Sequence, residues 1–435
     1  MLSTDCPIRR WTMIIYGVKS YLARFSAIFL LILGMWGCGS VPSLEELPRP
    51  TSRLPFVRVL LADGARQHVI YLPNGGQMYI ECQKGDKRVG YYSGRPVTVA
   101  GEKQTLALYY ENQRTLDYDI DGIIISPRGK NPRLVYDGKE YRGLLELTSS
   151  SGQIRLVNIV YVEDYLRGVV PLEIGPTPKE QIEAIKAQAV AARTYSMAHL
   201  DQFGPEVNYD LKSDVTDQLY GGVAVEDKLC NEAIEATAGM VAVYHGLLID
   251  AYYHSTCGGS TDDIEDVWDK DPRPYLRAVQ DDQACSISKY FTWQERFSAD
   301  QMVMRLERYL TQARGAEIRV GRLADVVVSD RTPGGRTAAV VFETTGGHFV
   351  FNKEEVRRVV RRSDDLEALL RSASFTIDVT RNTLGEITYV TFDGHGYGHG
   401  VGMCQMGAKG LSLKGVTYDS ILSLYYQGTN LKQLY

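Results

Sequence analysis

The alternating glycines of the segment GHGYGHGVGM, residues 394–403, constrain the fold more than any other feature of the sequence. Glycine inside a regular element costs roughly 0.5–1 kcal/mol relative to alanine, so a plain linker would not need so many. In an extended chain successive side chains point to opposite faces. We therefore expect His395, Tyr397 and His399 on one face and bare backbone on the other, which together would form a flat polar surface.

This segment lacks the usual nucleotide and metal signatures. No frame of its glycines fits the G-x-G-x-x-G dinucleotide pattern, and no Gly-Lys-Ser/Thr follows it as in a phosphate loop. An extended run would hold His395 and His399 about 13 Å apart, too far for one shared metal ion. A glycine-rich turn with solvated histidines is the simpler alternative.

The composition excludes a further class of partner. The chain has 435 residues, a net charge of −5 and an ordinary globular balance of 44% hydrophobic and 23% charged residues. Because it offers no basic surface field for a phosphate backbone, we expect no nucleic-acid partner.

The N-terminus has the pattern of an export signal. Basic residues precede FSAIFLLILGMWG, an apolar run too short for a membrane span and of the length of a signal-peptide core. The run ends at Gly37-Cys38-Gly39-Ser40, which resembles a bacterial lipobox. Residues 1–38 are therefore predicted to be a lipoprotein signal with Cys38 lipidated, and an uncleaved anchor and plain secretion are the alternatives. We expect an exported protein anchored to the membrane in the bacterial cell envelope.

The rest of the chain divides by its patterns. Residues 39–55 are rich in proline and predict a tether. Over 56–150, runs such as FVRVLL, HVIYL, QMYIEC, TLALYY and GIIIS predict a β-rich module. Residues 151–435 predict a mixed α/β domain with an insertion at about 298–372, which carries amphipathic helices at 298–314 and 352–372. The expected fold class is α+β, a β-rich N-terminal module followed by this mixed domain with its helical insertion.

The strongest helix pattern covers residues 177–202, TPKEQIEAIKAQAVAARTYSMAHLDQ. Thr177 at the N-cap, Pro178 at the first helical position and Glu180 three residues after the cap predict a capping box. Gln188 and Tyr195 are seven residues apart and share one helix face, which makes them candidate substrate-binding residues.

Glu173 is the candidate catalytic acid. It lies in VVPLEIGPTP among the apolar residues Val170, Leu172 and Ile174, and burial there would disfavour its charged form, as a general acid requires. The start of the following helix would pull its pKa down instead. A cap or a surface charge is the alternative role.

Two interpretations of the cysteines are possible, a zinc site and a disulfide. His254 and Cys257 have H-x-x-C spacing, and with Cys285 they could hold a structural zinc through three protein ligands. In an exported protein a Cys257–Cys285 disulfide is the alternative. The loop SDVTDQLYGG, residues 213–222, contains Asp214, Asp217 and Gln218, residue types that commonly form turns.

Six blocks in order carry a family resemblance. They are EDYLRGVVPLEIGP, EAIKAQAVAARTYSM, DVTDQLYGG, AYYHSTCGGST, VWDKDPRPYLRAV and GHGYGHGVGMCQMGAKGLS. Together they resemble the signature blocks of the SpoIID/LytB family, over about residues 151–435. Residues 56–150 and the insertion carry no matching block.

The resemblance implies a lytic transglycosylase that acts on peptidoglycan glycan strands, especially strands without stem peptides. Glu173 matches the family's catalytic glutamate, which would form a 1,6-anhydromuramyl product without a required cofactor. His399 and Gln405 are expected to contact the glycan, and His395 to hold the loop together. The alternative function is a non-catalytic peptidoglycan-binding activator of a cell-wall amidase. A zinc-dependent amidase is weaker, because no H-E-x-x-H pattern occurs.

Overall fold

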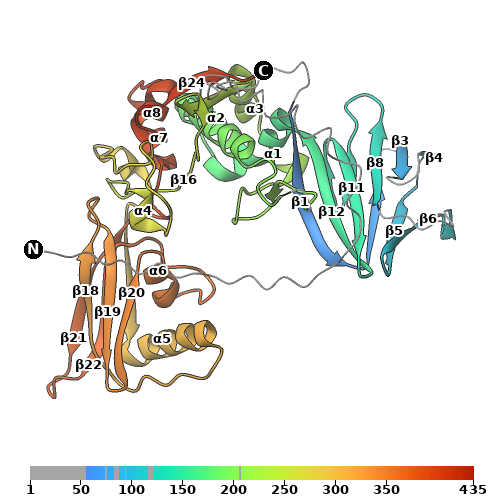
Figure 1. Cartoon of the computed structure of the whole chain (residues 1–435). Coiled ribbons are helices and arrows are strands. Elements are labelled where there is room, and N and C mark those ends of the chain that lie inside the picture. Colours follow the sequence, from blue (N-terminus) through green and yellow to red (C-terminus); the bar gives the residue numbers. More distant parts are fainter. Residues whose placement is uncertain (1–54, 74–75, 83–87, 94, 116–121, 205–206) are drawn as a thin grey trace, which may run out of the picture. The chain divides into compact units, whose positions relative to one another are not determined.

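The computed structural model describes residues 55–73, 76–82, 88–93, 95–115, 122–204 and 207–435 (Figure 1). The predicted signal peptide, Cys38 and all of the predicted tether except Pro55 lie outside these residues. Among the helices that are described, none has the length and apolar character needed to span a membrane.

The N-terminal region forms two sheets, which confirms its β-rich pattern. The seven-stranded sheet has the order β13-β1-β12-β11-β8-β3-β4, and the six-stranded sheet has the order β10-β9-β2-β5-β6-β7. The strands are β1 Phe56–Ala65, β2 Gln67–Tyr71, β3 Gln77–Cys82, β4 Arg88–Ser93, β5 Val97–Glu102, β6 Thr105–Tyr110, β7 Gln113–Arg114, β8 Gly122–Arg128, β9 Leu134–Tyr136, β10 Lys139–Tyr141, β11 Leu144–Ser150, β12 Gln153–Tyr161 and β13 Leu211–Lys212. Alternate apolar residues such as Ile70, Ile80 and Ile123 are fully buried in one cluster. The seven-stranded sheet continues past residue 150, because β12 and β13 pair with β1.

Helix α1, Val162–Ile174, follows β12 directly and contains Glu173 in its last turn. The sequence pattern did not predict this helix, because Gly168 and Pro171 lie inside it. It ends at Gly175, whose φ of 67° lies in the region that favours glycine.

The long helix begins later than its capping pattern predicts. A 3₁₀ turn at Lys179–Gln181 precedes α2, Ile182–Ala198, and no side chain caps either element. The predicted capping box at Thr177 is wrong, because the Thr177 hydroxyl donates to the carbonyl oxygen of Gly175 at 2.8 Å instead.

Helix α2 lies at the centre of the helical part of the fold. Its alanines allow close packing, and it contacts α1, α3, α7, α8 and β14 (Figure 1). Buried Arg193 on α2 forms a two-pronged ion pair with Glu163 on α1, at 2.8 and 2.7 Å. The other elements here are η2 Gly222–Val225, α3 Lys228–Ala236, β14 Met240–Tyr244, β15 Leu247–Leu248, α4 Ile264–Val267, η3 Ala284–Ile287, α7 Gln405–Leu413, α8 Tyr418–Tyr425 and β24 Asn430–Gln433.

A short parallel pair joins two of the sequence blocks. Strand β16, Tyr253–His254, pairs with β23, Met403–Cys404, so that Tyr253 lies opposite Met403 and His254 opposite Cys404. This pairing places the H-x-x-C segment beside the end of the glycine-rich segment.

The region from 292 to 395 contains two three-stranded sheets, with orders β17-β22-β21 and β18-β19-β20. Its elements are β17 Thr292–Ser298, α5 Ala299–Arg314, β18 Leu323–Arg331, β19 Thr337–Thr344, β20 Gly347–Asn352, α6 Glu355–Val360, β21 Ser374–Arg381 and β22 Ile387–His395. Helix α5 confirms its prediction and packs against β17, β18 and β22 (Figure 1).

The helix predicted over 352–372 is wrong beyond Val360. Arg361 has a φ of 55°, which ends α6. The Asp365 carboxylate then accepts hydrogen bonds from the backbone N–H groups of Glu367 and Ala368, and such local bonds favour a turn over a helix.

Candidate functional site

Three residues predicted from the sequence, Glu173, Tyr195 and His399, line one cavity of about 300 Å³, here called the acid cavity. Its full lining is Glu173, Tyr195, Val215, Thr216, Asp217, Leu219, Tyr252, Tyr253, Trp268 and His399. These residues come from the end of α1, from α2, from the loop after β13, from the segment around β16, from the end of α4 and from the segment before β23.

Glu173 is half-buried at this cavity, and its environment favours the protonated form. Burial raises the pKa of its carboxyl group to about 7, against the opposing effect of a hydrogen bond that Leu219 N–H donates to Oε1 at 2.8 Å. The carboxyl group lies near the C-terminal end of α1, where the helix dipole also disfavours a negative charge. The sequence expectation that a helix N-terminus would lower this pKa was wrong, because α2 begins only after the 3₁₀ turn.

His399 is held in one neutral tautomer. Its Nε2–H donates to the Tyr253 carbonyl oxygen at 2.9 Å, and its Nδ1 accepts from Val401 N–H at 3.1 Å. Burial, with a smaller effect of the Arg357 charge, lowers the pKa of His399 to about 3. Because both ring nitrogens have backbone partners, the histidine presents its ring to the cavity and carries no mobile proton.

Aromatic rings form much of the remaining wall. The Trp268 ring lies 4.8 Å from the His399 ring and 5.1 Å from the Tyr252 ring, centroid to centroid. The Tyr195 hydroxyl donates to Asp217 Oδ1 at 3.2 Å, and Lys212 N–H donates to Asp217 Oδ2 at 2.9 Å. Sequence reasoning did not single out Tyr252, Tyr253 or Trp268, although all three lie in or beside the quoted blocks. The Leu219 N–H is a backbone group and gives no signal in the sequence.

The glycine-rich segment is not the flat surface that the alternation predicts. After β22 ends at His395, every second residue has a positive φ: Gly396 81°, Gly398 115°, Gly400 88° and Gly402 69°. The glycines allow this segment to lie close to other parts of the same chain. A Cβ on Gly402, for example, would lie 2.1 Å from the Tyr252 carbonyl oxygen. His395 is exposed and Tyr397 stacks on Tyr290, with ring centroids 4.7 Å apart, so neither lines the acid cavity.

Gln188 and Gln405 are brought together, but away from the lining of the acid cavity. Both are buried, and Gln405 Nε2 donates to Gln188 Oε1 at 3.3 Å. Of the two residues predicted to share a helix face, Gln188 therefore lies in the core and Tyr195 lines the acid cavity. Spacing on a helix identifies a common face but not what covers each part of it.

The cysteines gather in a buried group, the cysteine cluster, that differs from the predicted ligand set. One ligand atom each of Cys257, Asp281, Cys285 and Cys404 lies within 4.8 Å of the others, so the cluster could hold a metal ion. The expected alternative, a Cys257–Cys285 disulfide, is not formed, because the two Sγ atoms are 3.5 Å apart. His254 stands outside the cluster, and its Nδ1–H donates to the Val401 carbonyl oxygen at 3.2 Å.

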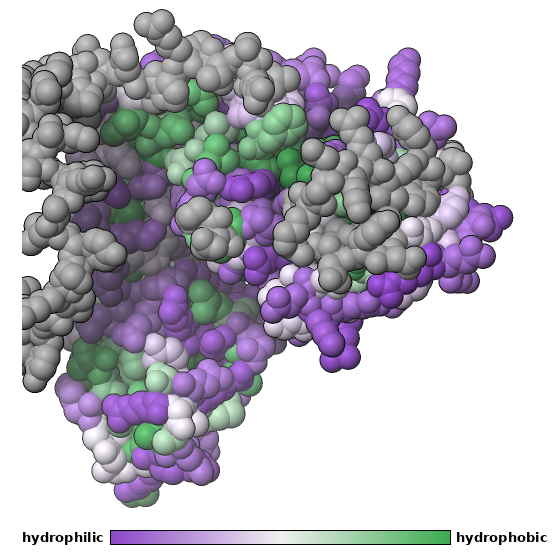
Figure 2. Space-filling view, turned by 45° about the vertical axis from the view of Figure 1, so that its right-hand side comes forward, coloured by the Kyte–Doolittle hydropathy of each residue, from purple (hydrophilic) through white to green (hydrophobic). Residues whose placement is uncertain are grey.

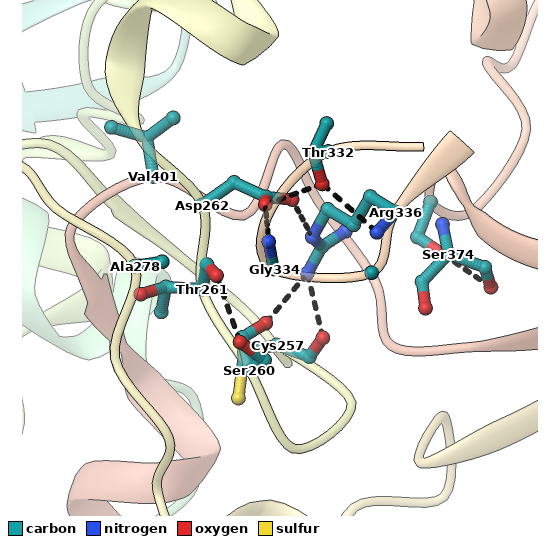
Figure 3. Close-up of polar contacts among 12 residues, drawn as sticks. Cys257, Ser260, Thr261, Asp262, Ala278, Thr332, Gly334, Arg336, Ser374 and Val401 are labelled. Carbon is teal, nitrogen blue, oxygen red and sulfur yellow. Dashed lines mark hydrogen bonds and ion pairs between the residues drawn. The ribbon is translucent and has the colours of Figure 1, made fainter. Parts of the chain in front are cut away.

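A buried ion pair, the Arg336 network, ties the region after β18 to the cysteine-bearing loop (Figure 3). Arg336 Nε lies 3.0 Å from Asp262 Oδ2, and Arg336 Nη2 donates to the Cys257 carbonyl oxygen at 2.6 Å. Asp262 Oδ1 accepts from the Thr332 hydroxyl at 2.6 Å, and Asp262 N–H donates to the Gly400 carbonyl oxygen at 2.8 Å. The network therefore links the insertion, the cysteine-bearing loop and the segment that carries His399.

Figure 2 shows hydrophilic areas in purple around smaller hydrophobic patches in green.

Two protein-family models match parts of the chain. The family model described as SpoIID, stage II sporulation protein, matches residues 150–244, and one described as a domain of unknown function, DUF8618, matches residues 281–402. An uncharacterised protein of Brachyspira hyodysenteriae is 30% identical over 295 residues, which cover 68% of this chain and 73% of that protein.

Two further relatives have descriptive names. Stage II sporulation protein D of Bacillus amyloliquefaciens is 30% identical over 296 residues, covering 64% of this chain and 76% of that protein. The amidase enhancer of Bacillus subtilis is 30% identical over 334 residues, covering 69% of this chain but only 45% of the enhancer. On these similarities the chain belongs to the SpoIID family, whose relatives include stage II sporulation protein D and the amidase enhancer.

Proposed function

We propose that this protein is a peptidoglycan lytic transglycosylase that cleaves glycan strands, with Glu173 as general acid and base. One observation carries the proposal: a carboxyl group with a pKa raised to about 7 opens into a cavity walled by aromatic rings. Such a group is protonated in a large fraction of molecules near neutral pH, as a general acid must be. Aromatic walls with a few fixed polar groups suit a sugar ring.

The chemistry needs a single carboxyl group. Protonated Glu173 gives its proton to the glycosidic oxygen while the bond from that oxygen to C1 of the muramyl sugar breaks. The resulting carboxylate then takes the proton from the C6 hydroxyl of the same sugar, and the C6 oxygen bonds to C1. The products are a 1,6-anhydromuramyl end and a free 4-hydroxyl on the released sugar, and Glu173 regains its proton.

The other polar groups of the acid cavity have fixed partners. Asp217 accepts bonds on both carboxylate oxygens, and both nitrogens of His399 are engaged. Besides Glu173, Asp217 is the carboxylate that the lining of the acid cavity offers, so a second carboxylate that activates water, as in inverting hydrolases, would have to be a group already engaged by Tyr195 and Lys212. This favours the internal C6 hydroxyl over water as the nucleophile.

Mass spectrometry of products from glycan strands without stem peptides tests the proposal. The expected products end in a 1,6-anhydro ring, whereas a hydrolase would leave a reducing muramyl end. The relative named amidase enhancer favours a second candidate, a glycan-binding activator of a cell-wall amidase. Stimulation of an amidase without any anhydro product would favour that candidate.

We also propose export and membrane anchoring through a lipid on Cys38, because a basic stretch and a short apolar run precede Gly37-Cys38. Cys38→Ala should release the protein from membranes or block its processing. Fractionation of cells that carry the variant measures this, and normal cleavage with unchanged membrane retention would contradict lipidation at Cys38.

We propose that the metal suited to the cysteine cluster is zinc. Zinc binds thiolates and carboxylates in tetrahedral sites, where two sulfurs lie about 3.8 Å apart, close to the 3.5 Å between Cys257 and Cys285. Hydrogen bonds from the Cys257 and Cys404 thiols lower the pKa of Cys285 and favour its thiolate. Asp281 Oδ1 is buried without a partner among the described residues.

Metal analysis of purified protein should then find about one zinc per chain. Cys285→Ser should lose the metal and the stabilising effect of added zinc on thermal unfolding. Cys230→Ser, a buried cysteine outside the cluster, is the matched control and should keep the metal. The assignment would be contradicted if purified wild type contained no metal and its cluster cysteines reacted with a thiol reagent as free thiols.

A further inference from the structure

A second cavity of about 530 Å³ adjoins the acid cavity, and Trp268 lines both. The lining of this second cavity is Val267, Trp268, Asp269, Asn352, Lys353, Glu354, Glu355 and Arg358. One wall thus comes from the segment around Trp268, and the other from the end of β20 and the start of α6. This second wall belongs to the insertion, which carries no SpoIID block and lies within the residues that match DUF8618.

The acid cavity alone is small for a polymer. Its volume of about 300 Å³ lies at the lower end of small-molecule sites, which span roughly 300–1,000 Å³. A glycan strand bound for cleavage must continue beyond it. The shared Trp268 makes the second cavity a continuation of the same surface.

Trp268 is held as a platform between the two cavities. Its ring packs on His399 and Tyr252, and the Lys270 ammonium lies 5.4 Å from its ring centroid. Lys353 Nζ donates to the Trp268 carbonyl oxygen at 3.4 Å and to Asp269 Oδ1 at 2.7 Å. The insertion therefore supports the backbone of the platform directly.

Among the described residues that line the second cavity, Arg358 is the one cation without an ion pair, and Glu355 is the one carboxylate whose partner is neutral. The Asp269 carboxylate pairs with Lys353, Glu354 pairs with Arg357 at 2.7 Å, and Glu355 accepts from the Tyr309 hydroxyl at 2.8 Å. Arg358 is exposed and forms no ion pair with any residue that the structure describes. A guanidinium in such a position suits a carboxylate ligand.

We propose that the second cavity is a glycan subsite that recognises a lactyl carboxylate of the strand through Arg358. The inference rests on the proposed function, since a strand without stem peptides carries a free carboxylate on each muramyl sugar. Trp268 supports the sugar ring at the boundary of the two cavities. The insertion thereby contributes to the choice of strands whose peptides have been removed.

Binding by the full chain carrying Glu173→Gln, which keeps the strand intact, tests the subsite. The probes are peptide-free muramyl glycans of one to four disaccharide repeats, and chito-oligosaccharides of equal length, which lack carboxylates. Affinity should rise with length for the muramyl glycans. Adding Arg358→Ala should weaken binding of the longest muramyl glycan about tenfold, as expected for a lost charged hydrogen bond, and leave the shortest unchanged.

The matched control is Arg314→Ala, an exposed arginine in the last turn of α5 that lines neither cavity. It should bind every probe like the parent. Equal binding of the long muramyl glycan with and without Arg358→Ala overturns the subsite, and so does an equal loss for the chito-oligosaccharides. If the parent binds no muramyl glycan of any length, the proposed function itself fails and the subsite with it.

Discussion

Replacing Glu173 by glutamine is expected to lower turnover of peptide-free glycan strands by about 10²–10⁴-fold, the usual contribution of general acid–base catalysis. Glutamine keeps the shape of the side chain and can still accept from Leu219 N–H, but it has no proton to give. Glycan binding should therefore persist. Product formation measured by mass spectrometry, beside binding measured by calorimetry, separates the two effects.

The matched control is Glu180→Gln, an exposed glutamate between α1 and α2 that does not line the acid cavity. It should turn over like wild type. Glu173→Asp should also lose activity, because a carboxyl group shortened by one methylene no longer reaches the same point. If wild type forms no anhydro product, yet wild type and Glu173→Gln stimulate an amidase equally, the activator function takes the place of the enzyme.

The pH dependence follows from the same carboxyl group. Its pKa in the folded chain is raised from 4.5 to about 7, so the acid form is lost as the pH rises through about 7, and the first step should slow there. The same shift links folding stability to pH. The stabilisation that the carboxyl group contributes is fully present below pH 4.5 and is lost as the pH rises through about 7. Glutamine does not ionise, so Glu173→Gln removes this loss of stability at high pH. The thermal unfolding temperature of the variant at pH 8 should therefore be no lower than that of wild type.

Replacing Arg336 by methionine is expected to destabilise the fold by about 3–5 kcal/mol, the range for removing one partner of a buried ion pair. Arg336 is 2% exposed and Asp262 is fully buried. Burial raises the pKa of Asp262 and the Arg336 charge lowers it, so loss of the arginine leaves a carboxylate with a large desolvation cost. Urea unfolding of the variant measures the loss.

A double-mutant comparison identifies the cause. Arg336→Met with Asp262→Asn should recover part of the lost stability, because no buried charge is then left alone. The surface pair of Arg381 with Asp325 supplies the control, and Arg381→Met should change stability by no more than about 1 kcal/mol. Equal effects of Arg336→Met and Arg381→Met would contradict a special role for the buried pair.

The sequence predicted the local chemistry of the site better than its geometry. The apolar neighbours of Glu173 indicated a desolvated carboxyl group, and its pKa is raised for that reason. The helix that carries Glu173 was missed, because Pro171 and Gly168 are typical of turns. Pro171 is tolerated in the last turn of α1. Gly168 is required in the middle of this helix, because a Cβ at that position would lie 2.5 Å from the Tyr220 ring.

Local sequence patterns could not predict the contacts between segments that are far apart in the chain. H-x-x-C spacing paired His254 with Cys257, but the parallel pairing of β16 with β23 brings Cys404 to the cluster instead. Alternation in the glycine-rich segment predicted an extended strand. The pattern cannot show that backbone from residues 252–257 fills the space that a Cβ on Gly396 or Gly402 would need. The β-rich pattern succeeded because alternation there reports burial on a sheet face.

The hydrogen bond from Leu219 N–H to Glu173 has a consequence for the two oxygens of the carboxyl group. Oε1 accepts from an amide that cannot turn away, so the proton of the acid form belongs on Oε2. The loop after β13 thus makes the two oxygens unequal before any sugar arrives. In the proposed reaction, proton delivery and proton return would then use the same atom, and the side chain would not need to rotate between the two steps.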